Sequence, residues 1–478
     1  MTMTTLKKIL LTSFLATPFA ASAQTSTALN LPRLFSDGMV LQQQSKAAVW
    51  GWGAASSTVC IVGSWSPKDT VRTTVNDIGH WKSEIRTTAH GGPYQLRIFT
   101  TGNERGGITL NDVWLGEVWI CSGQSNMEWS PANGLENQKT EIEAAQYPEI
   151  RYFSLTKRGS DNPQEDCIGK WETCTPANMA RRSAVAYYFG KNIHETLNVP
   201  VGLIVSAWGG TPAEVWIPKD SIENDPVLKD VKHKPEPWWP VANGKLYNGM
   251  IHPLLPYQIA GAIWYQGESN RDYPKTYART MEMLVNSWRK GFGKDFPFYM
   301  VQIAPFNYND PTNGPALIRE AQEINRQTIP NSGLVITNDI GDPRNIHPIK
   351  KKEVGKRLAD LALAKTYKVL NKEVDSPFLE SATVQKQKVI LTFSHAENGL
   401  FCPEKTVKGI RIAGEDRNFK EAKVNIDGNK LIVSAKEIKN PRYVSYCFDD
   451  ATIGNLFNRE GLPMAPFQAE CSTETLKK

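Results

Sequence analysis

The middle of the chain alternates short apolar runs with longer segments of helical periodicity, and this alternation restricts the fold more than any other feature. The runs have the length of buried strands. They are Val113–Cys121, Val201–Ala207, Ile259–Tyr265, Phe298–Ile303 and Gly333–Thr337. The helical periods between and after them are Ala184–Leu197, Lys275–Lys290, Ala316–Thr328 and Ile349–Tyr367. Strands joined by helices form right-handed crossovers, so the sequence predicts an α/β domain with a parallel sheet covered on both faces.

Both flanks of this region have a different pattern, because their apolar residues come in short alternating runs separated by Gly, Asp and Asn turns. Such runs are typical of antiparallel β-structure. A chain of 478 residues also has room for two to four domains. We therefore expect a small β-sandwich over residues 24–108, an α/β domain over residues 109–367 and a β-rich domain over residues 368–478.

The first residues have the three parts of a secretory signal peptide. Lys7 and Lys8 precede an apolar stretch from Ile9 to Ala20, and Ala21-Ser22-Ala23 offers a cleavage site before Gln24. The stretch is too short to cross a bilayer, and no later segment approaches ~18 uninterrupted apolar residues. The sequence predicts an exported protein, periplasmic or extracellular, with a signal peptide at residues 1–23 and no membrane span.

The net charge of +6 is mild for this length, and Lys and Arg are scattered along the chain. A nucleic-acid partner is therefore not expected. Metal-ligand spacing is missing as well, because His194-Glu195 lacks the second His of H-E-x-x-H and no paired C-x-x-C occurs. We expect neither a metal nor another cofactor.

Seven cysteines in an exported chain allow up to three disulfides. Cys167 and Cys174 lie close together in sequence, and Cys402 and Cys447 could bridge strands of the last domain. Buried free thiols are an equally good interpretation, because spacing alone does not fix the connectivity.

Polar segments follow four of the five predicted strands. In an open parallel sheet, reactive groups lie beyond the carboxyl ends of the strands. The four segments are Cys121–Trp129, Trp208–Glu214, Gln266–Asn270 and Asn338–Pro348. Any one of them alone is more typical of a turn. Their occurrence at four strand ends indicates a site.

These segments contain each part that acyl transfer by a serine requires: a hydroxyl, a base and donors for the oxyanion. Ser125 supplies the hydroxyl and His347 the imidazole. The predicted oxyanion donors are the backbone N–H groups of Ser125 and of Gly209 or Gly210, and the side-chain amides of Gln266 or Asn270. The predicted substrate-binding residues are Gln124, Asn126, Trp208, Glu268 and Arg344. Met127 replaces the second glycine of G-x-S-x-G, which disfavours an α/β-hydrolase.

The same segments resemble the sialate O-acetylesterases of the SGNH hydrolase superfamily. The matching motifs are Gly123–Trp129, Trp208–Thr211, Trp264–Asn270 and Ile346–Pro348, with flanking matches at Phe35–Gln42, Val49–Trp52, Asn455–Asn458 and Glu460–Pro463. The resemblance covers nearly the whole mature chain. It implies a three-layer α/β/α core with flanking antiparallel β-rich domains, hydrolysis of acetyl esters on sialic acid, Ser125 as nucleophile and His347 as base.

One position departs from the superfamily pattern. Its members commonly show D-x-x-H, but Arg344 stands three residues before His347. The orienting carboxylate is then Asp342 or Asp339, or a backbone carbonyl takes its place. Asp342 is preferred because Pro343 biases it toward extended geometry, whereas Asp339 directly follows the buried strand and suits a turn-closing role.

Two other functions fit the sequence. One is an acetylesterase for other acetylated glycans such as xylan, which needs the same catalytic groups and a different pocket. An arginine in the pocket would favour a sialate carboxylate, and the eligible residues are Arg181, Arg182, Arg271 and Arg344. The other function is a non-catalytic glycan-binding protein whose tryptophans stack on sugars. The expected partner is an O-acetylated sugar or glycan, and the oligomeric state is left open.

Overall fold

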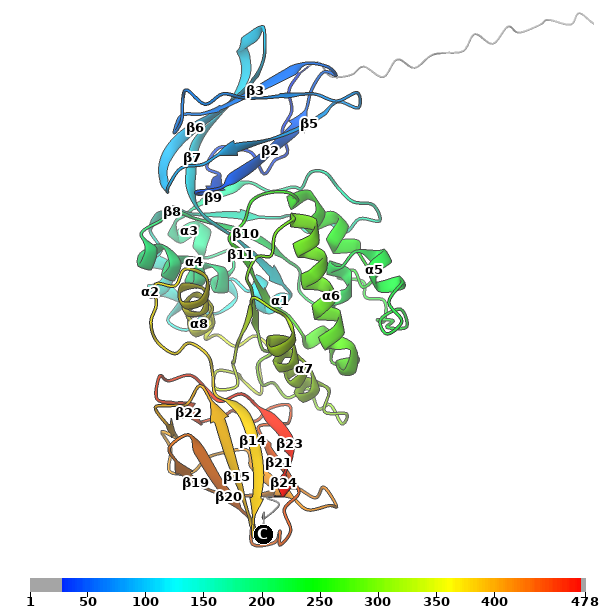
Figure 1. Cartoon of the computed structure of the whole chain (residues 1–478), viewed down its shortest axis with the longest axis vertical. Helices are drawn as coiled ribbons and strands as arrows, with labels where there is room; N and C mark the ends of the chain where they lie inside the picture. Colours follow the sequence, from blue (N-terminus) through cyan, green and yellow to red (C-terminus); the bar gives the residue numbers. More distant parts are fainter. Residues whose placement is uncertain (1–27, 474–478) are drawn as a thin grey trace, which may run out of the picture.

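The computed structural model describes residues 28–473, so the predicted signal peptide lies outside the described part of the chain. Figure 1 shows an α/β region in the middle, with β-rich structure above and below it. Within residues 28–473, no helix combines the length and apolar character needed to cross a membrane.

The central sheet has the strand order β13-β12-β11-β7-β10-β8-β9. All pairs are parallel except the last, β8 with β9. The strands are β7 (Asn103–Gly123), β8 (Tyr147–Ser154), β9 (Trp171–Cys174), β10 (Val201–Ala207), β11 (Gly261–Tyr265), β12 (Phe298–Val301) and β13 (Ser332–Val335). All five predicted runs are strands of this sheet, which confirms the predicted α/β class.

Helices cover both faces of the sheet, as the three-layer expectation required (Figure 1). Side chains alternate along the strands, so Ile120 of β7 belongs to one core and Trp119 to the other. Helices α6 and α7 pack on the first core, and α4 and α8 on the second. The helices are α1 (Ser125–Glu128), α2 (Gln138–Glu143), α3 (Pro176–Met179), α4 (Ala184–Leu197), α5 (Lys219–Glu223), α6 (Pro274–Phe292), α7 (Gly314–Thr328) and α8 (Lys351–Leu361).

Strand β8 pairs in parallel with β10 in the central sheet, and the sequence analysis missed it. Its buried centre contains Arg151, whose guanidinium pairs with Asp112 at 2.5 Å between Nη1 and Oδ2. A charged residue in the middle of a strand breaks the apolar run by which a buried strand is recognised. The ion pair with Asp112 is what allows this residue to be buried.

The N-terminal β-structure is continuous with the central sheet, because β7 runs from one into the other (Figure 1). Strand β6 pairs with the first part of β7, and β10 and β11 pair with its last part. The predicted boundary between residues 108 and 109 therefore falls inside one strand. The other N-terminal strands are β1 (Val40–Gln42), β2 (Lys46–Trp52), β3 (Thr58–Gly63), β4 (Val71–Thr74), β5 (His80–Arg86) and β6 (Gly91–Thr100).

The C-terminal β-structure has its own hydrophobic core and consists mainly of antiparallel strands. All seven cysteines are free thiols, so neither the Cys167–Cys174 pair nor the Cys402–Cys447 pair forms a disulfide. The strands are β14 (Phe378–Gln385), β15 (Lys388–Ser394), β16 (Leu400–Phe401), β17 (Ile410–Ala413), β18 (Lys420–Glu421), β19 (Lys423–Asp427), β20 (Lys430–Ser434), β21 (Tyr443–Tyr446), β22 (Phe457–Asn458), β23 (Phe467–Glu470) and β24 (Ser472–Thr473).

A substitution at Leu203 of β10 tests the contact between the sheet and α4. Its side chain is fully buried and packs so closely on Gly190 that a Cβ there would lie 2.8 Å from Leu203 Cδ1. Leu203→Ala should lower the free energy of unfolding by about 2–5 kcal/mol, because it leaves a cavity in the core. Thermal or urea unfolding measures this loss. The control Ile78→Ala, at a side chain that is 75% exposed, should change stability by less than about 0.5 kcal/mol.

Candidate active site

Ser125 lies directly beyond the carboxyl end of β7, at the first position of helix α1. The turn requires Gly123, whose φ is +133° and where a Cβ would lie 2.2 Å from the Tyr265 carbonyl oxygen. The next residue, Gln124, donates its backbone N–H to the same carbonyl at 3.0 Å. The end of β7 is thus held against β11, and Ser125 projects beyond both strands.

His347 meets Ser125 at hydrogen-bond distance, with 2.8 Å between Nε2 and the serine Oγ. It lies in the loop between β13 and α8. Trp129 stacks on the imidazole with ring centroids 4.3 Å apart and an angle of 17° between the planes. The His347 backbone N–H donates to Asn345 Oδ1 at 2.9 Å. A hydroxyl and an imidazole from segments 222 residues apart in sequence are therefore brought into contact.

The imidazole of His347 is a weak base in this environment. Burial lowers its pKa to about 4, and the charge of Lys351 acts in the same direction. Both effects disfavour the imidazolium. At neutral pH the ring is therefore uncharged and can accept a proton from Ser125.

A buried polar network lies beside this pair. Lys351 Nζ donates to Asn126 Oδ1 at 2.5 Å, and Asn126 Nδ2 donates to Glu268 Oε1 at 2.7 Å. The exposed fractions of these side chains are 3% or less. Burial lowers the pKa of Lys351 to about 7, against the opposing charge of Glu268. Asn126 also donates to the Ile346 carbonyl at 3.1 Å, which holds the segment that carries His347.

This network changes the interpretation of two predicted substrate-binding residues. Asn126 and Glu268 are buried and bonded to protein groups. Their hydrogen bonds hold the segment next to His347 in place. Lys351 was missed, because a lysine at the start of an amphipathic helix is most often a solvated residue. Its only sequence signal is its place four residues after His347.

The predicted oxyanion donors lie in different environments. The Gly209 N–H donates to Glu128 Oε2 at 2.9 Å, so it is already bonded. Gly209 nevertheless packs on the nucleophile candidate, since a Cβ there would lie 3.1 Å from Ser125 Cβ. Within residues 28–473, the backbone N–H groups of Ser125 and Gly210 have no hydrogen-bond partner.

The side chains of Gln266 and Asn270 are fully buried and bonded to protein groups. Gln266 Nε2 donates to Asn270 Oδ1 at 2.8 Å and to the Thr211 carbonyl at 3.2 Å. Asn270 Nδ2 donates to both carboxylate oxygens of Glu214. These hydrogen bonds link the segments that follow β10 and β11. Because they use the N–H groups of both amides, the amides are not available as oxyanion donors.

The other predicted substrate-binding residues are spread around the site. Gln124 Oε1 accepts from the backbone N–H groups of Gly267 and Ser269 at 3.3 and 3.4 Å. Trp208 is partly buried, and its ring lies 5.8 Å from the Lys157 ammonium. Arg344 is exposed to solvent.

Neither candidate carboxylate is bonded to His347. Asp342 Oδ1 accepts from the Arg344 backbone N–H at 2.9 Å. Both oxygens of Asp339 pair with the Arg357 guanidinium, at 2.9 and 2.6 Å. In the described part of the chain, no carboxylate forms a hydrogen bond with either ring nitrogen of His347. The structure therefore brings the predicted nucleophile and base together, and leaves Asp342 apart from them.

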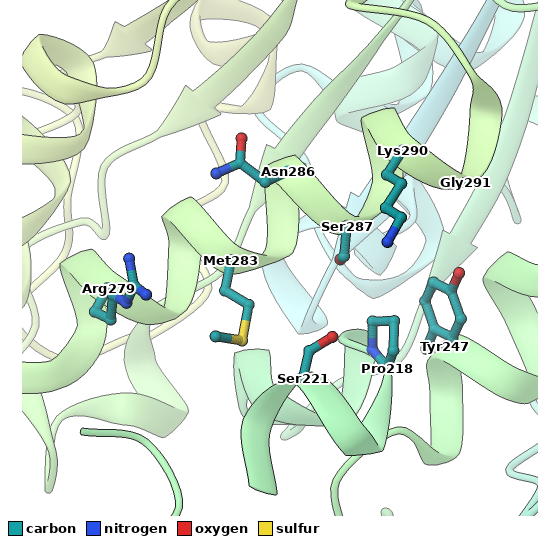
Figure 2. A pocket seen from close by; sticks show the side chains of 9 residues that line it. All are labelled: Pro218, Ser221, Tyr247, Arg279, Met283, Asn286, Ser287, Lys290 and Gly291. Atoms are coloured by element: carbon teal, nitrogen blue, oxygen red, sulfur yellow. The ribbon is translucent and has the colours of Figure 1, made fainter. Parts of the chain in front are cut away.

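Two further features lie outside this cluster. A cavity of about 690 Å³ lies between α5 and α6, with Met283 of α6 facing Ser221 of α5 (Figure 2). None of its lining residues comes from the four polar strand exits. Glu373, Asp375 and His395 have the composition of a metal site. Lys365 already neutralises Asp375 at 2.8 Å, however, and His395 bonds Glu373 at 3.0 Å.

Comparisons with known proteins agree with this fold. A family model described as carbohydrate esterase, sialic acid-specific acetylesterase matches residues 115–364. The human sialate O-acetylesterase is 29% identical over 401 residues, which cover 75% of each chain. The rat enzyme of the same name is 29% identical over 418 residues, covering 75% of this chain and 77% of its own.

A solved structure extends the likeness to the whole molecule. A carbohydrate acetylesterase from Xanthomonas citri is 33% identical, with a TM-score of 0.84, and the match covers 92% of this chain and 99% of that chain. The fold and these matches define the protein as a carbohydrate esterase. Within this class, the chain belongs to the family of sialic acid-specific acetylesterases.

The pKa of His347 can be used to test how the charge of Lys351 acts on the imidazole. Lys351→Met should raise the pKa of His347 from about 4 toward the 6.5 of a free imidazole, because it removes a positive charge that opposes the imidazolium. Titration of the imidazole NMR signals measures the shift. Lys352→Met is the matched control, since Lys352 is exposed and pairs with Glu141 at 2.6 Å. An unchanged pKa in Lys351→Met, or equal shifts in both variants, would contradict the assignment.

Proposed function

We propose that this carbohydrate esterase removes O-acetyl groups from sialic acids, with Ser125 as the nucleophile and His347 as the general base. The observation that carries the proposal is the 2.8 Å contact between Ser125 Oγ and His347 Nε2 at the carboxyl edge of the sheet. A partly exposed serine in contact with an uncharged imidazole has the composition of an acyl-transfer site.

In the proposed reaction, Ser125 Oγ attacks the acetyl carbonyl carbon while His347 Nε2 takes the hydroxyl proton. The resulting oxyanion is held by the backbone N–H groups of Ser125 and Gly210, which lack protein partners among the described residues. His347 then gives its proton to the sugar oxygen as the ester bond breaks. His347 next takes a proton from a water molecule as that water attacks the acetyl carbonyl carbon. It returns the proton to Ser125 Oγ as the bond between Oγ and the acetyl carbon breaks and acetate leaves.

The site supports a Ser–His dyad. Asp342 and Asp339 are bonded to other groups, and neither reaches His347. Trp129 stacks flat on the imidazole, and an aromatic face attracts a cation. We therefore propose that Trp129 both orients His347 and stabilises the imidazolium that forms during the reaction.

The sugar specificity rests on the relatives. The human and rat relatives are named sialate O-acetylesterases, and the family model carries the same specificity in its description. The Xanthomonas citri relative is named a carbohydrate acetylesterase, without a sugar. Since its match covers more of the chain, an esterase for other acetylated glycans such as xylan is the second candidate. Acetate release from acetylated sialic acid and from acetylated xylo-oligosaccharide, compared at equal concentration, distinguishes the two.

We also propose that the enzyme is exported to the periplasm or the cell exterior, on the basis of the signal-peptide pattern of residues 1–23. Sequencing the N-terminus of the protein recovered after expression with its native leader tests this proposal. Cleavage before Gln24 is the expected result, and an intact Met1 in the cytoplasmic fraction would contradict it.

Ser125→Ala should reduce kcat for acetate release by several orders of magnitude, because it removes the proposed nucleophile. A chromogenic aryl acetate suffices for the measurement, and circular dichroism checks that the fold is intact. Ser287→Ala is the matched control, since Ser287 lines the separate cavity of Figure 2 and should keep wild-type activity. Near-normal turnover by Ser125→Ala would refute the mechanism.

Asp342→Asn separates a dyad from a triad. If Asp342 only accepts the Arg344 backbone N–H, the variant should lose less than about 10-fold in kcat. A carboxylate that orients the base would instead cost up to about 10⁴-fold. The same assay and a melting curve for each variant provide the measurement. A loss near the second value would assign the orienting role to Asp342.

A further inference from the structure

A cavity of about 420 Å³ lies at the exits of β10 and β11. A monosaccharide fits within such a volume. Its lining residues come from three segments: Gly210 and Pro212; His233, Lys234, Glu236, Trp239 and Val241; and Ser269, Arg271 and Asp272.

One residue of the cavity lining adjoins the Ser125 site in sequence. Gly209 packs on Ser125, and the next residue, Gly210, lines the cavity. Trp239 covers Gly210 so closely that a Cβ there would lie 2.3 Å from the indole. Ser269 Oγ donates to the Gly210 carbonyl at 2.9 Å. An acetyl ester positioned at Ser125 would therefore have its sugar ring in this cavity.

The segment of the cavity lining that contains His233 is anchored by hydrogen bonds and ring packing. His233 Nε2 lies 3.0 Å from Glu214 Oε2, and Glu214 is fully buried. Asn270 donates to the same carboxylate. The His233 ring also packs edge-on against Tyr273, with centroids 5.2 Å apart. These contacts fix the loop that carries Lys234 and Trp239 over the cavity.

The structure distinguishes between the four arginines that the sequence offered as candidates for binding a sialate carboxylate. Arg182 is paired with Glu172, with 2.7 Å from Nε to Oε2, while Arg181 and Arg344 are exposed and do not line this cavity. Arg271 lines the cavity and is partly buried.

The Arg271 guanidinium is held in place without a salt bridge to an acidic side chain, although its charge helps to lower the pKa of Asp310. Its Nη1 donates to the Glu268 carbonyl at 3.3 Å, and it lies 5.4 Å from the centre of the Tyr308 ring. In the described residues it has no ion pair. The carboxylates that line the cavity, Glu236 and Asp272, are exposed to solvent, where their charge is screened. A planar fork of unpaired N–H donors suits a carboxylate.

We propose that this cavity is the sugar subsite and that Arg271 binds the carboxylate of an acidic sugar, with Trp239 against the ring. The inference rests on the proposed function, because it names the group by which that site selects its substrate. Arg271 is thus a specificity-determining residue, and a neutral sugar would gain nothing from it.

Calorimetry on the Ser125→Ala variant tests this inference without turnover. The ligands are free N-acetylneuraminic acid and its neutral methyl ester. The acid should bind about 10- to 100-fold more tightly than the ester, as expected for a charge-assisted bidentate contact. Adding Arg271→Gln should abolish this preference, and adding Arg72→Gln, the same change at an exposed arginine of β4, should preserve it. A preference that survives Arg271→Gln, or no binding of the acid, would overturn the inference.

Kinetics then separates this inference from the proposed function. Arg271→Gln should raise KM for acetylated sialic acid much more than it raises KM for an aryl acetate, which has no carboxylate to bind. Equal losses on both substrates would mean that Arg271 only supports the fold, which overturns the specificity role while the esterase mechanism stands. If wild-type protein binds the acid selectively but releases no acetate, the proposed function fails and the subsite remains.

Discussion

The parallel register of β7 with its two neighbours determines where the chemistry lies. Gly123 pairs with Ala207 of β10 on one side and with Tyr265 of β11 on the other, so the three strands end at the same level. Ser125 follows two residues after Gly123, and Gly209 two residues after Ala207. Their close contact is a consequence of this register and of the missing side chain at Gly209. A slip of one residue would turn every side chain of a strand to the opposite face and separate the two groups.

The same packing buries opposite charges beside the proposed nucleophile and base, and the amide of Asn126 makes this possible. An isolated buried charge is unfavourable by several kcal/mol, on the order of the stability of a whole domain. The side chain of Asn126 has an acceptor on one atom and donors on the other, so it bonds the Lys351 ammonium and the Glu268 carboxylate at once. The cation therefore stays beside His347 without a direct salt bridge. Its field disfavours the imidazolium, and this is one cause of the low pKa of His347.

How much the sequence could predict depended on whether a residue's role was visible in its local pattern. Strand β10 was predicted at its observed bounds, Val201–Ala207, because all of its residues are apolar or small. Ser125 and His347 were named because polar segments follow four of the five predicted strands, and their occurrence together indicates a site. Strand β8 was missed because Arg151 interrupts it. The role of Lys351 could not be predicted, since its burial depends on groups more than 80 residues away in sequence.

In the proposed mechanism, no bonded carboxylate counteracts the effects that lower the pKa of His347. A carboxylate beside the imidazole would stabilise the imidazolium and raise its pKa, whereas burial and Lys351 lower it. A histidine of low pKa removes the Ser125 proton less readily, but once protonated it is a stronger acid. The leaving group of a sugar acetate is a basic alkoxide, which leaves readily only when it receives a proton. The arrangement around His347 therefore favours the step that is hardest for a sugar ester, and Trp129 offsets part of the cost by stacking on the cation.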